Sequence, residues 1–184
     1  SIIDAELTVI GSGQAVRVRP GGPGGTLADI TMGVVGSGDN AFAILNQGVI
    51  STGANVEGSD AEAVTIEGLV SSGTVYSATL TGGLRNDGGD IRAGTTDGTA
   101  TTLRIGNYGS VPTILNSGDI LAVTLDSGED TETNVISELG GNAFAIIVEE
   151  QGSLSSVINT GTIQADAAGS GSSAGAIIDR SGSI

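Results

Sequence analysis

The sequence predicts an all-β fold, a β-solenoid in which short parallel strands stack along one axis, and three observations lead to it. First, Gly accounts for 32 of the 184 residues, and the chain has two Phe, two Tyr and no Trp. This composition does not suit a compact core of large side chains, but it suits many short strands joined by turns. Second, a short turn motif recurs along the chain, and third, an alanine motif recurs between its copies. Such repetition is typical of stacked supersecondary units.

The turn motif reads apolar residue, Asn or Ser, any residue, Gly, any residue, β-branched apolar residue. Asn and Gly tolerate the positive φ of tight turns, so the motif predicts the end of one strand, a turn and the start of the next strand. Its copies are Leu45–Ile50, Val70–Val75, Arg85–Ile91 (one residue longer), Leu115–Ile120 and Ile158–Ile163. In a stack, Asn46, Asn116 and Asn159 would form a ladder in which each amide bonds to the next.

The alanine motif reads Ala, any residue, Ala, apolar residue. Its copies are Ala41–Ile44, Ala61–Val64, Ala143–Ile146 and Ala174–Ile177, with a weaker copy at Ala100–Leu103. Phe42 and Phe144 hold equivalent places in two copies, and we interpret them as stacked core residues, with ligand contact as the alternative. The uneven spacing of the turn motifs predicts loops of unequal length, with a degenerate coil around Leu125–Gly128.

The remaining segments also favour strands and loops. Residues 6–10 and 15–19 alternate apolar and polar side chains, which predicts two strands, and Pro20–Gly25 predicts an exposed loop. Glu129–Leu139 predicts one short helix or an acidic loop. A sandwich or a barrel would also use short strands, but the repetition favours a solenoid. At roughly 20 to 25 residues per coil, residues 1–184 form a single segment of about eight coils.

The charge and the missing residue types exclude several functions. The chain has 21 acidic residues, six arginines and no lysine, for a net charge of −15, so a nucleic-acid partner is excluded. No apolar run reaches 18 residues, so we expect no membrane insertion by this segment. Cys and His are both absent, which removes disulfides, thiolate sites and the side chain most used for proton transfer near neutral pH.

No catalytic residue is predicted. Gly171–Gly175 matches the nucleophile-elbow pattern around Ser173, but the chain has no His to activate a serine. The match is therefore interpreted as chance.

The acidic clusters are candidates for two kinds of chemistry. Asp126, Glu129 and Asp130 are candidate Ca²⁺ ligands, because a hard cation binds several oxygen atoms. Paired carboxylates, here or at Asp60 with Glu62 and at Glu149 with Glu150, would also suit glycosidic hydrolysis. Since no calcium-loop motif is present, we prefer solvated loop charge and predict no cofactor, with calcium as the alternative.

Parts of the chain resemble passenger regions of bacterial autotransporter-type surface proteins. The residues that carry the resemblance are Leu103–Gly106, Val111–Gly118, Asn142–Ile146 and Ile158–Ala165, and it extends over most of residues 38–184. It implies a right-handed parallel β-helix that is exported through an outer-membrane barrel. It also implies a location outside a Gram-negative bacterium or on its surface. The chain departs from the full family pattern in having no translocator barrel.

The expected function is structural or adhesive and not enzymatic: a stiff stalk whose loops contact a glycan or protein of a host or surface. Open ends of a stack leave unpaired strand edges, so the chain is expected to continue into further coils of a longer protein or to associate head to tail. Two alternatives therefore stand: a subunit of a self-assembling extracellular filament, and a carbohydrate-active enzyme that uses paired carboxylates.

Overall fold

The computed structural model describes residues 2–3, 6–11, 13–21, 26–38, 41–54, 56–127, 140–169 and 171–184. All the regular secondary structure in these ranges is β-strand. The strands form three parallel sheets and one separate antiparallel hairpin. The prediction of an all-β fold with parallel strands is confirmed.

The largest sheet, here called sheet A, is assembled from strands far apart in the sequence. Its members are β1 (Ile2–Ile3), β4 (Ile30–Met32), β5 (Ile44–Asn46), β10 (Ala78–Leu80), β11 (Leu84–Asn86), β14 (Gly109–Asn116) and β17 (Ser153–Asn159). The long strand β14 pairs with β10 through its first residues and with β11 through its last. Strands β10 and β11 therefore share one level of the sheet.

Sheets B and C have five strands each. Sheet B consists of β2 (Glu6–Ile10), β6 (Val49–Gly53), β12 (Asp90–Thr96), β15 (Asp119–Leu125) and β18 (Thr162–Ala167). Sheet C consists of β3 (Gln14–Val18), β7 (Ala61–Ile66), β13 (Ala100–Ile105), β16 (Ala143–Val148) and β19 (Ala174–Asp179). The predicted strands at 6–10 and 15–19 correspond to β2 and β3.

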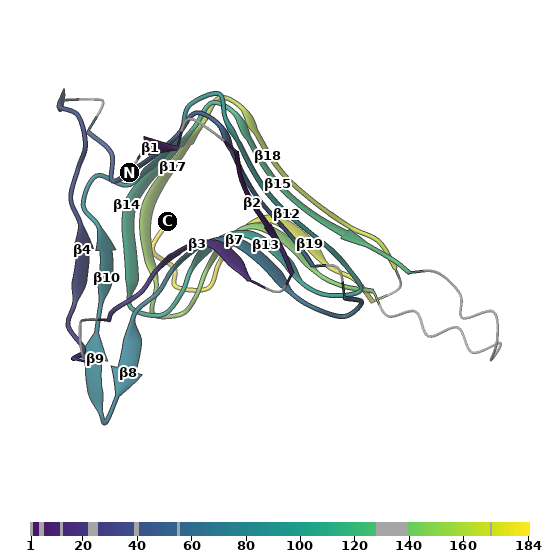
Figure 1. Cartoon of the computed structure of the whole chain (residues 1–184), viewed down its shortest axis with the longest axis horizontal. Coiled ribbons are helices and arrows are strands. Elements are labelled where there is room, and N and C mark those ends of the chain that lie inside the picture. Colours follow the sequence, from purple (N-terminus) through teal and green to yellow (C-terminus); the bar gives the residue numbers. More distant parts are fainter. Residues whose placement is uncertain are drawn as a thin grey trace.

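The chain passes through the sheets in the same order, A then B then C, each time. In Figure 1 the three sheets form three sides of a triangle, and the strands of each sheet lie over one another along the viewing direction. We call one such passage a coil. Equivalent asparagines in successive coils are separated by 40, 30 and 43 residues, which is longer than expected. The expectation of about eight coils is not confirmed, since sheets B and C have five strands each.

One turn motif does not take part in the stack. Residues Val70–Val75 belong to the hairpin of β8 (Leu69–Ser71) and β9 (Thr74–Tyr76), which projects away from the three sheets in Figure 1. Ser72 and Gly73, with φ values of 50° and 79°, form its tight turn. The motif thus predicted a turn correctly, but the turn does not belong to the stack. A hairpin turn and the turn between two sheets of a coil require similar residues, so the motif does not distinguish them. The degenerate coil expected around Leu125–Gly128 is also wrong, since β15 pairs directly with β18 and leaves no place for a coil between them, while Gly128 itself lies outside the described residues.

The interior is filled by aligned aliphatic side chains. Ile50, Ile91 and Ile120 lie in one column of sheet B, and each is completely buried. Burying one such side chain stabilises a fold by about 1.5–3 kcal/mol. The burial decreases at the outermost strands, where Leu7 and Ile177 are 36% and 44% exposed. The inner coils therefore supply most of the hydrophobic stabilisation.

The alanine motif marks the start of the strands of sheet C. Ala61, Ala100 and Ala143 align, and Ala174 continues the column. Ala100–Leu103, expected as the weaker copy, is thus a full member. Ala41–Ile44 is not equivalent to the others, because Ile44 begins β5 in sheet A. Its resemblance arises because both segments follow a turn and place small side chains inward.

Three further expectations concern segments outside the sheets. Pro20 and Gly21 follow β3 in irregular conformation, and residues 22–25 lie outside the described residues. The helix or acidic loop expected over Glu129–Leu139 also lies outside them. No helix that could cross a membrane is found in the part of the chain that the structure describes.

After β19 the backbone folds back onto sheet A and is held there by one carboxylate. Asp179 Oδ1 accepts hydrogen bonds from the Ser181 amide (2.9 Å) and the Gly182 amide (3.0 Å), and Oδ2 accepts one from the Ile184 amide (3.1 Å). Ser183 Oγ in turn accepts a hydrogen bond from the buried Leu154 amide at 3.0 Å. The hydrogen bond from the Ser181 hydroxyl, followed by that from the Ile184 amide, lowers the pKa of Asp179.

Replacing Asp179 by Ala should release this segment, because four hydrogen bonds lose their common acceptor. We expect amide exchange at Leu154 to become about fivefold faster, which corresponds to the loss of one ordinary hydrogen bond. Because the pKa is lowered in the folded chain, this restraint is present above the unfolded-state pKa and is lost as the pH falls through the folded value. Hydrogen exchange measured by NMR checks the expected release of the segment, and an unchanged exchange rate at Leu154 would contradict it.

Candidate functional site

The predicted asparagines lie together at the corner between sheets A and B. Asn46, Asn86, Asn116 and Asn159 form one continuous column. The Nδ2 atom of each of the first three donates to Oδ1 of the next at 2.7 Å. Asn86 was absent from the predicted ladder, although the extended motif Arg85–Ile91 would have identified it. Each of these asparagines is the last residue of its strand in sheet A, namely β5, β11, β14 and β17.

Each amide of the column also fixes the turn that follows it. Asn116 Nδ2 contacts the carbonyl oxygen of Gly118 at 2.9 Å and that of Thr162 in the next coil at 3.0 Å. Asn46, Asn86 and Asn116 are completely buried, whereas Asn159 in the outermost strand is exposed. The ladder thus supplies hydrogen bonds to the buried carbonyl groups of the turns, so its role is structural.

The turn that follows Asn86 carries charged groups on its outer side. Gln47 Nε2 donates to Asp87 Oδ2 at 3.0 Å, and Arg85 lies 2.9 Å from Oδ1. The Gln47 hydrogen bond, and then the Arg85 guanidinium, lower the pKa of Asp87. The Arg85 guanidinium also lies 5.6 Å from the ring centre of Phe42.

The two phenylalanines have different environments, so the expected equivalence is wrong. Phe42 is buried, at 8% exposure, beside an isolated antiparallel bridge to Val35. Phe144 lies in sheet C, in register with Thr101, and is partly exposed. Phe42 therefore fills core space, while Phe144 is accessible from outside.

A shallow depression on the outer face of sheet C surrounds Phe144. Its floor is Phe144 and Ile147, and its rim consists of polar and charged side chains from β7, β13 and the residues that flank the strands of sheet C. The rim residues are Asp60, Glu62, Thr99, Thr101, Arg104, Glu149 and Arg180. We call this feature the sheet C depression. It combines an apolar floor with hydrogen-bond donors and acceptors.

Arg104 connects the carboxylates around this depression. Its Nη1 lies 3.4 Å from Glu62 Oε1 and 3.6 Å from Glu67 Oε2, and its Nε lies 3.5 Å from Glu149 Oε1. Strong charge-assisted hydrogen bonds are nearer 2.7–2.9 Å. Arg180 completes the row, 3.0 Å from Glu149 Oε2, and Arg17 pairs with Glu67 at the other end. In each of two expected acidic pairs, one carboxylate, that of Glu62 or of Glu149, is thus paired with arginine.

Replacing Arg104 by Met should destabilise the chain by about 1 kcal/mol, because three carboxylates lose a shared cation that is partly exposed. The difference should shrink in 1 M salt, where exposed charges are screened. Arg92 is half exposed, and among the described residues its ion pair is with Asp90 of its own strand, so replacing it by Met should have almost no effect. Urea unfolding at two salt concentrations checks both variants, and equal losses would contradict the expectation.

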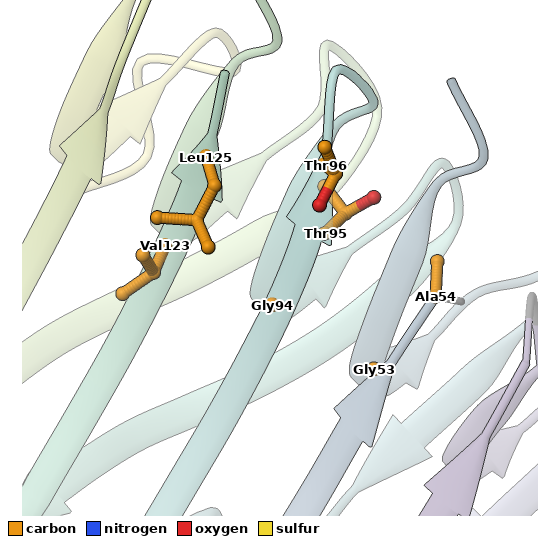
Figure 2. A pocket seen from close by; sticks show the side chains of 7 residues that line it. All are labelled: Gly53, Ala54, Gly94, Thr95, Thr96, Val123 and Leu125. Atoms are coloured by element: carbon orange, nitrogen blue, oxygen red, sulfur yellow. The ribbon is translucent and has the colours of Figure 1, made fainter. Parts of the chain in front are cut away.

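A second depression lies on the outer face of sheet B. Gly53 and Gly94, side by side on β6 and β12, form its floor, and Val123 and Leu125 on β15 form one wall, as Figure 2 shows. A Cβ on Gly94 would meet its nearest neighbour only at 3.9 Å, so the fold does not require glycine there. The groove is apolar, and Leu125 is 58% exposed.

The predicted metal and nucleophile candidates are not brought into a site by the described residues. Asp126 follows β15, whereas Glu129 and Asp130 lie outside the described residues. No group of three or more acidic side chains that could hold a metal ion occurs in the described ranges. Ser173 lies just before β19, where its amide donates to Asn142 Oδ1 at 3.1 Å.

The sheet C depression therefore has the widest range of chemical groups of the sites described, and the asparagine ladder serves the fold. A comparison of the chain with models of protein families, with curated proteins and with solved structures gives no match.

Proposed function

We propose that the chain is a right-handed parallel β-helix and that it serves as a stiff structural and adhesive segment. We place it in a protein exported to the surface or exterior of a Gram-negative bacterium. The observation that carries the proposal is the parallel register, which continues through five strands in each of sheets B and C. Such a frame resists bending, because each coil is bonded along its full length to the next.

The unequal lengths of the coils support the adhesive part of the proposal. The ladder asparagines keep their alignment although the coils differ by up to 13 residues, and the additional residues lie in connections such as the β8–β9 hairpin. A regular frame with irregular projections presents variable surface without altering the core. The role is non-enzymatic in this proposal.

Spin labels on the outermost strands of sheet B test the frame. Thr8 and Gln164 lie in one outward-facing column, four strand spacings apart, or about 19 Å. Because the chain has no cysteine, Thr8→Cys and Gln164→Cys provide the only two thiols. Electron double resonance should give one narrow distance near 20–30 Å, including the label arms. A broad distribution would refute a rigid stack.

Location requires a separate measurement. Antibodies raised against the chain should label intact cells of the source organism as strongly as lysed cells. Labelling only after lysis would refute the surface placement without affecting the frame.

A filament subunit is the second candidate, and the free edges of the outermost strands favour it. Within the described residues, β18 and β19 have a partner on one side only, as do β2 and β3 at the opposite end. Unpaired edges readily accept another strand. Sedimentation should then show a mass that rises with concentration, whereas monomers at every concentration would eliminate this candidate.

A further inference from the structure

We infer that the sheet C depression is a binding site for the uncharged hexose units of a polysaccharide. This inference rests on the adhesive part of the proposed function and assigns that part a place and a ligand class. The argument comes from the floor, the rim and the charge of the site.

The floor suits one face of a sugar ring. Phe144 projects outward from β16 and is partly exposed, and Ile147 lies beside it on the same face at 4% exposure. The next position beyond Phe144 is Gly175, and the Ile178 side chain, 2.6 Å from where a Cβ of Gly175 would lie, covers it and borders the ring. The accessible apolar group is therefore the Phe144 ring, and an aromatic ring packs against the C–H groups of a pyranose while the hydroxyl groups point to the rim.

The rim suits hydroxyl groups, which donate and accept hydrogen bonds at once. The carboxylates of Glu62 and Glu149 are acceptors, the guanidinium of Arg104 is a donor, and Thr99 and Thr101 carry groups that do both. Arg104 is held 3.4–3.6 Å from its three carboxylates, so its N–H groups keep capacity for a closer partner. A bound hydroxyl would supply that partner.

The charge balance selects an uncharged ligand. The charged rim residues and the side chains that form ion pairs with them comprise four carboxylates and four guanidinium groups, in a chain whose net charge is −15. These residues are Asp60, Glu62, Glu67 and Glu149, with Arg17, Arg19, Arg104 and Arg180. An anionic polysaccharide would be repelled by the rest of the molecule, and a cationic ligand would compete with the arginines already in place.

The site can be tested with three uncharged hexamers, cellohexaose, maltohexaose and mannohexaose, and with hexagalacturonate as the charged counterpart. We expect isothermal titration calorimetry to detect at least one uncharged hexamer and no hexagalacturonate. Phe144→Ala should weaken that binding at least tenfold, and Phe144→Tyr should retain it. Val123→Ala, in the sheet B groove, should leave the affinity unchanged and serves as the matched control.

Three results would overturn the inference: no binding of any uncharged hexamer at 10 mM, preferential binding of hexagalacturonate, or equal affinity in Phe144→Ala. Thermal unfolding shows whether each variant is folded. If Phe144→Ala does not fold, the NMR shifts of the ring protons in Phe144→Tyr are followed during addition of the sugar instead. A narrow spin-label distance without sugar binding would refute this inference alone. A broad distance would refute the frame on which both proposals depend.

Discussion

Replacing Asn116 by Asp should cost the chain about 4 kcal/mol of its free energy of unfolding at neutral pH. The substitution keeps the shape of the side chain but removes the amide that donates to Asn159 Oδ1 and to the carbonyl oxygens of Gly118 and Thr162. A buried carboxylate would then face three oxygen atoms, and such unpaired buried charge is strongly destabilising. Urea unfolding followed by circular dichroism measures the loss.

The pH dependence identifies the cause. The surrounding oxygens should raise the pKa of the new carboxyl above its unfolded value of about 4. A raised pKa means that the protonated form is favoured in the folded chain, so the variant should lose stability relative to the original as the pH rises from about 4. Asn159→Asp, at the exposed end of the column, is the control and should lose far less. Equal losses at the two positions would show that the ladder is not a structural unit.

Replacing Gly118 by Ala should cost at least about 3 kcal/mol, because a Cβ at this position would overlap the carbonyl oxygen of Gly89 in the neighbouring coil. That oxygen belongs to the backbone of a packed corner and cannot move away without disturbing the sheets on both sides. The midpoint of thermal unfolding, or the loss of folded protein, measures the effect.

Gly94→Ala is the matched control, since it places the same methyl group on an open outer surface of sheet B. Alanine suits an extended strand better than glycine does, so the control should be neutral or slightly more stable. If both variants were equally destabilised, close approach at the coil corner would not explain the glycines of the turn motif.

The prediction from sequence succeeded where a residue type repeats for one physical reason. Asn46, Asn116 and Asn159 were selected because an amide can both donate and accept along a column, and the structure places them in one column. The glycine two positions further was explained by a positive φ, but Gly118 does not have one. The close passage of another coil requires glycine there, and a single segment of sequence contains no sign of a neighbour 30 or 43 residues away.

The errors arose where different backbones share the same local chemistry. Val70–Val75 has the composition of a corner but forms a hairpin, and Ala41–Ile44 has the composition of a sheet C strand but enters sheet A. The coil length was underestimated because these false copies shortened the apparent repeat. The sheet C depression was not predicted, since Phe144, Arg104 and Glu149 come from two strands and a turn and meet only after the coils align. The sequence marked Phe144 as a possible ligand contact and Glu62 and Glu149 as members of separate acidic pairs, but it did not bring them together or include Arg104.

The parallel register also gives the molecule a mechanical direction. Each strand is bonded to strands one coil away, so a force along the stacking axis opens one coil before it reaches the next. The separations of 40, 30 and 43 residues between ladder asparagines would then release about 100–150 Å of chain per step. A force across the axis instead loads all hydrogen bonds of a sheet in shear at once, and the same molecule would break abruptly and at a higher load.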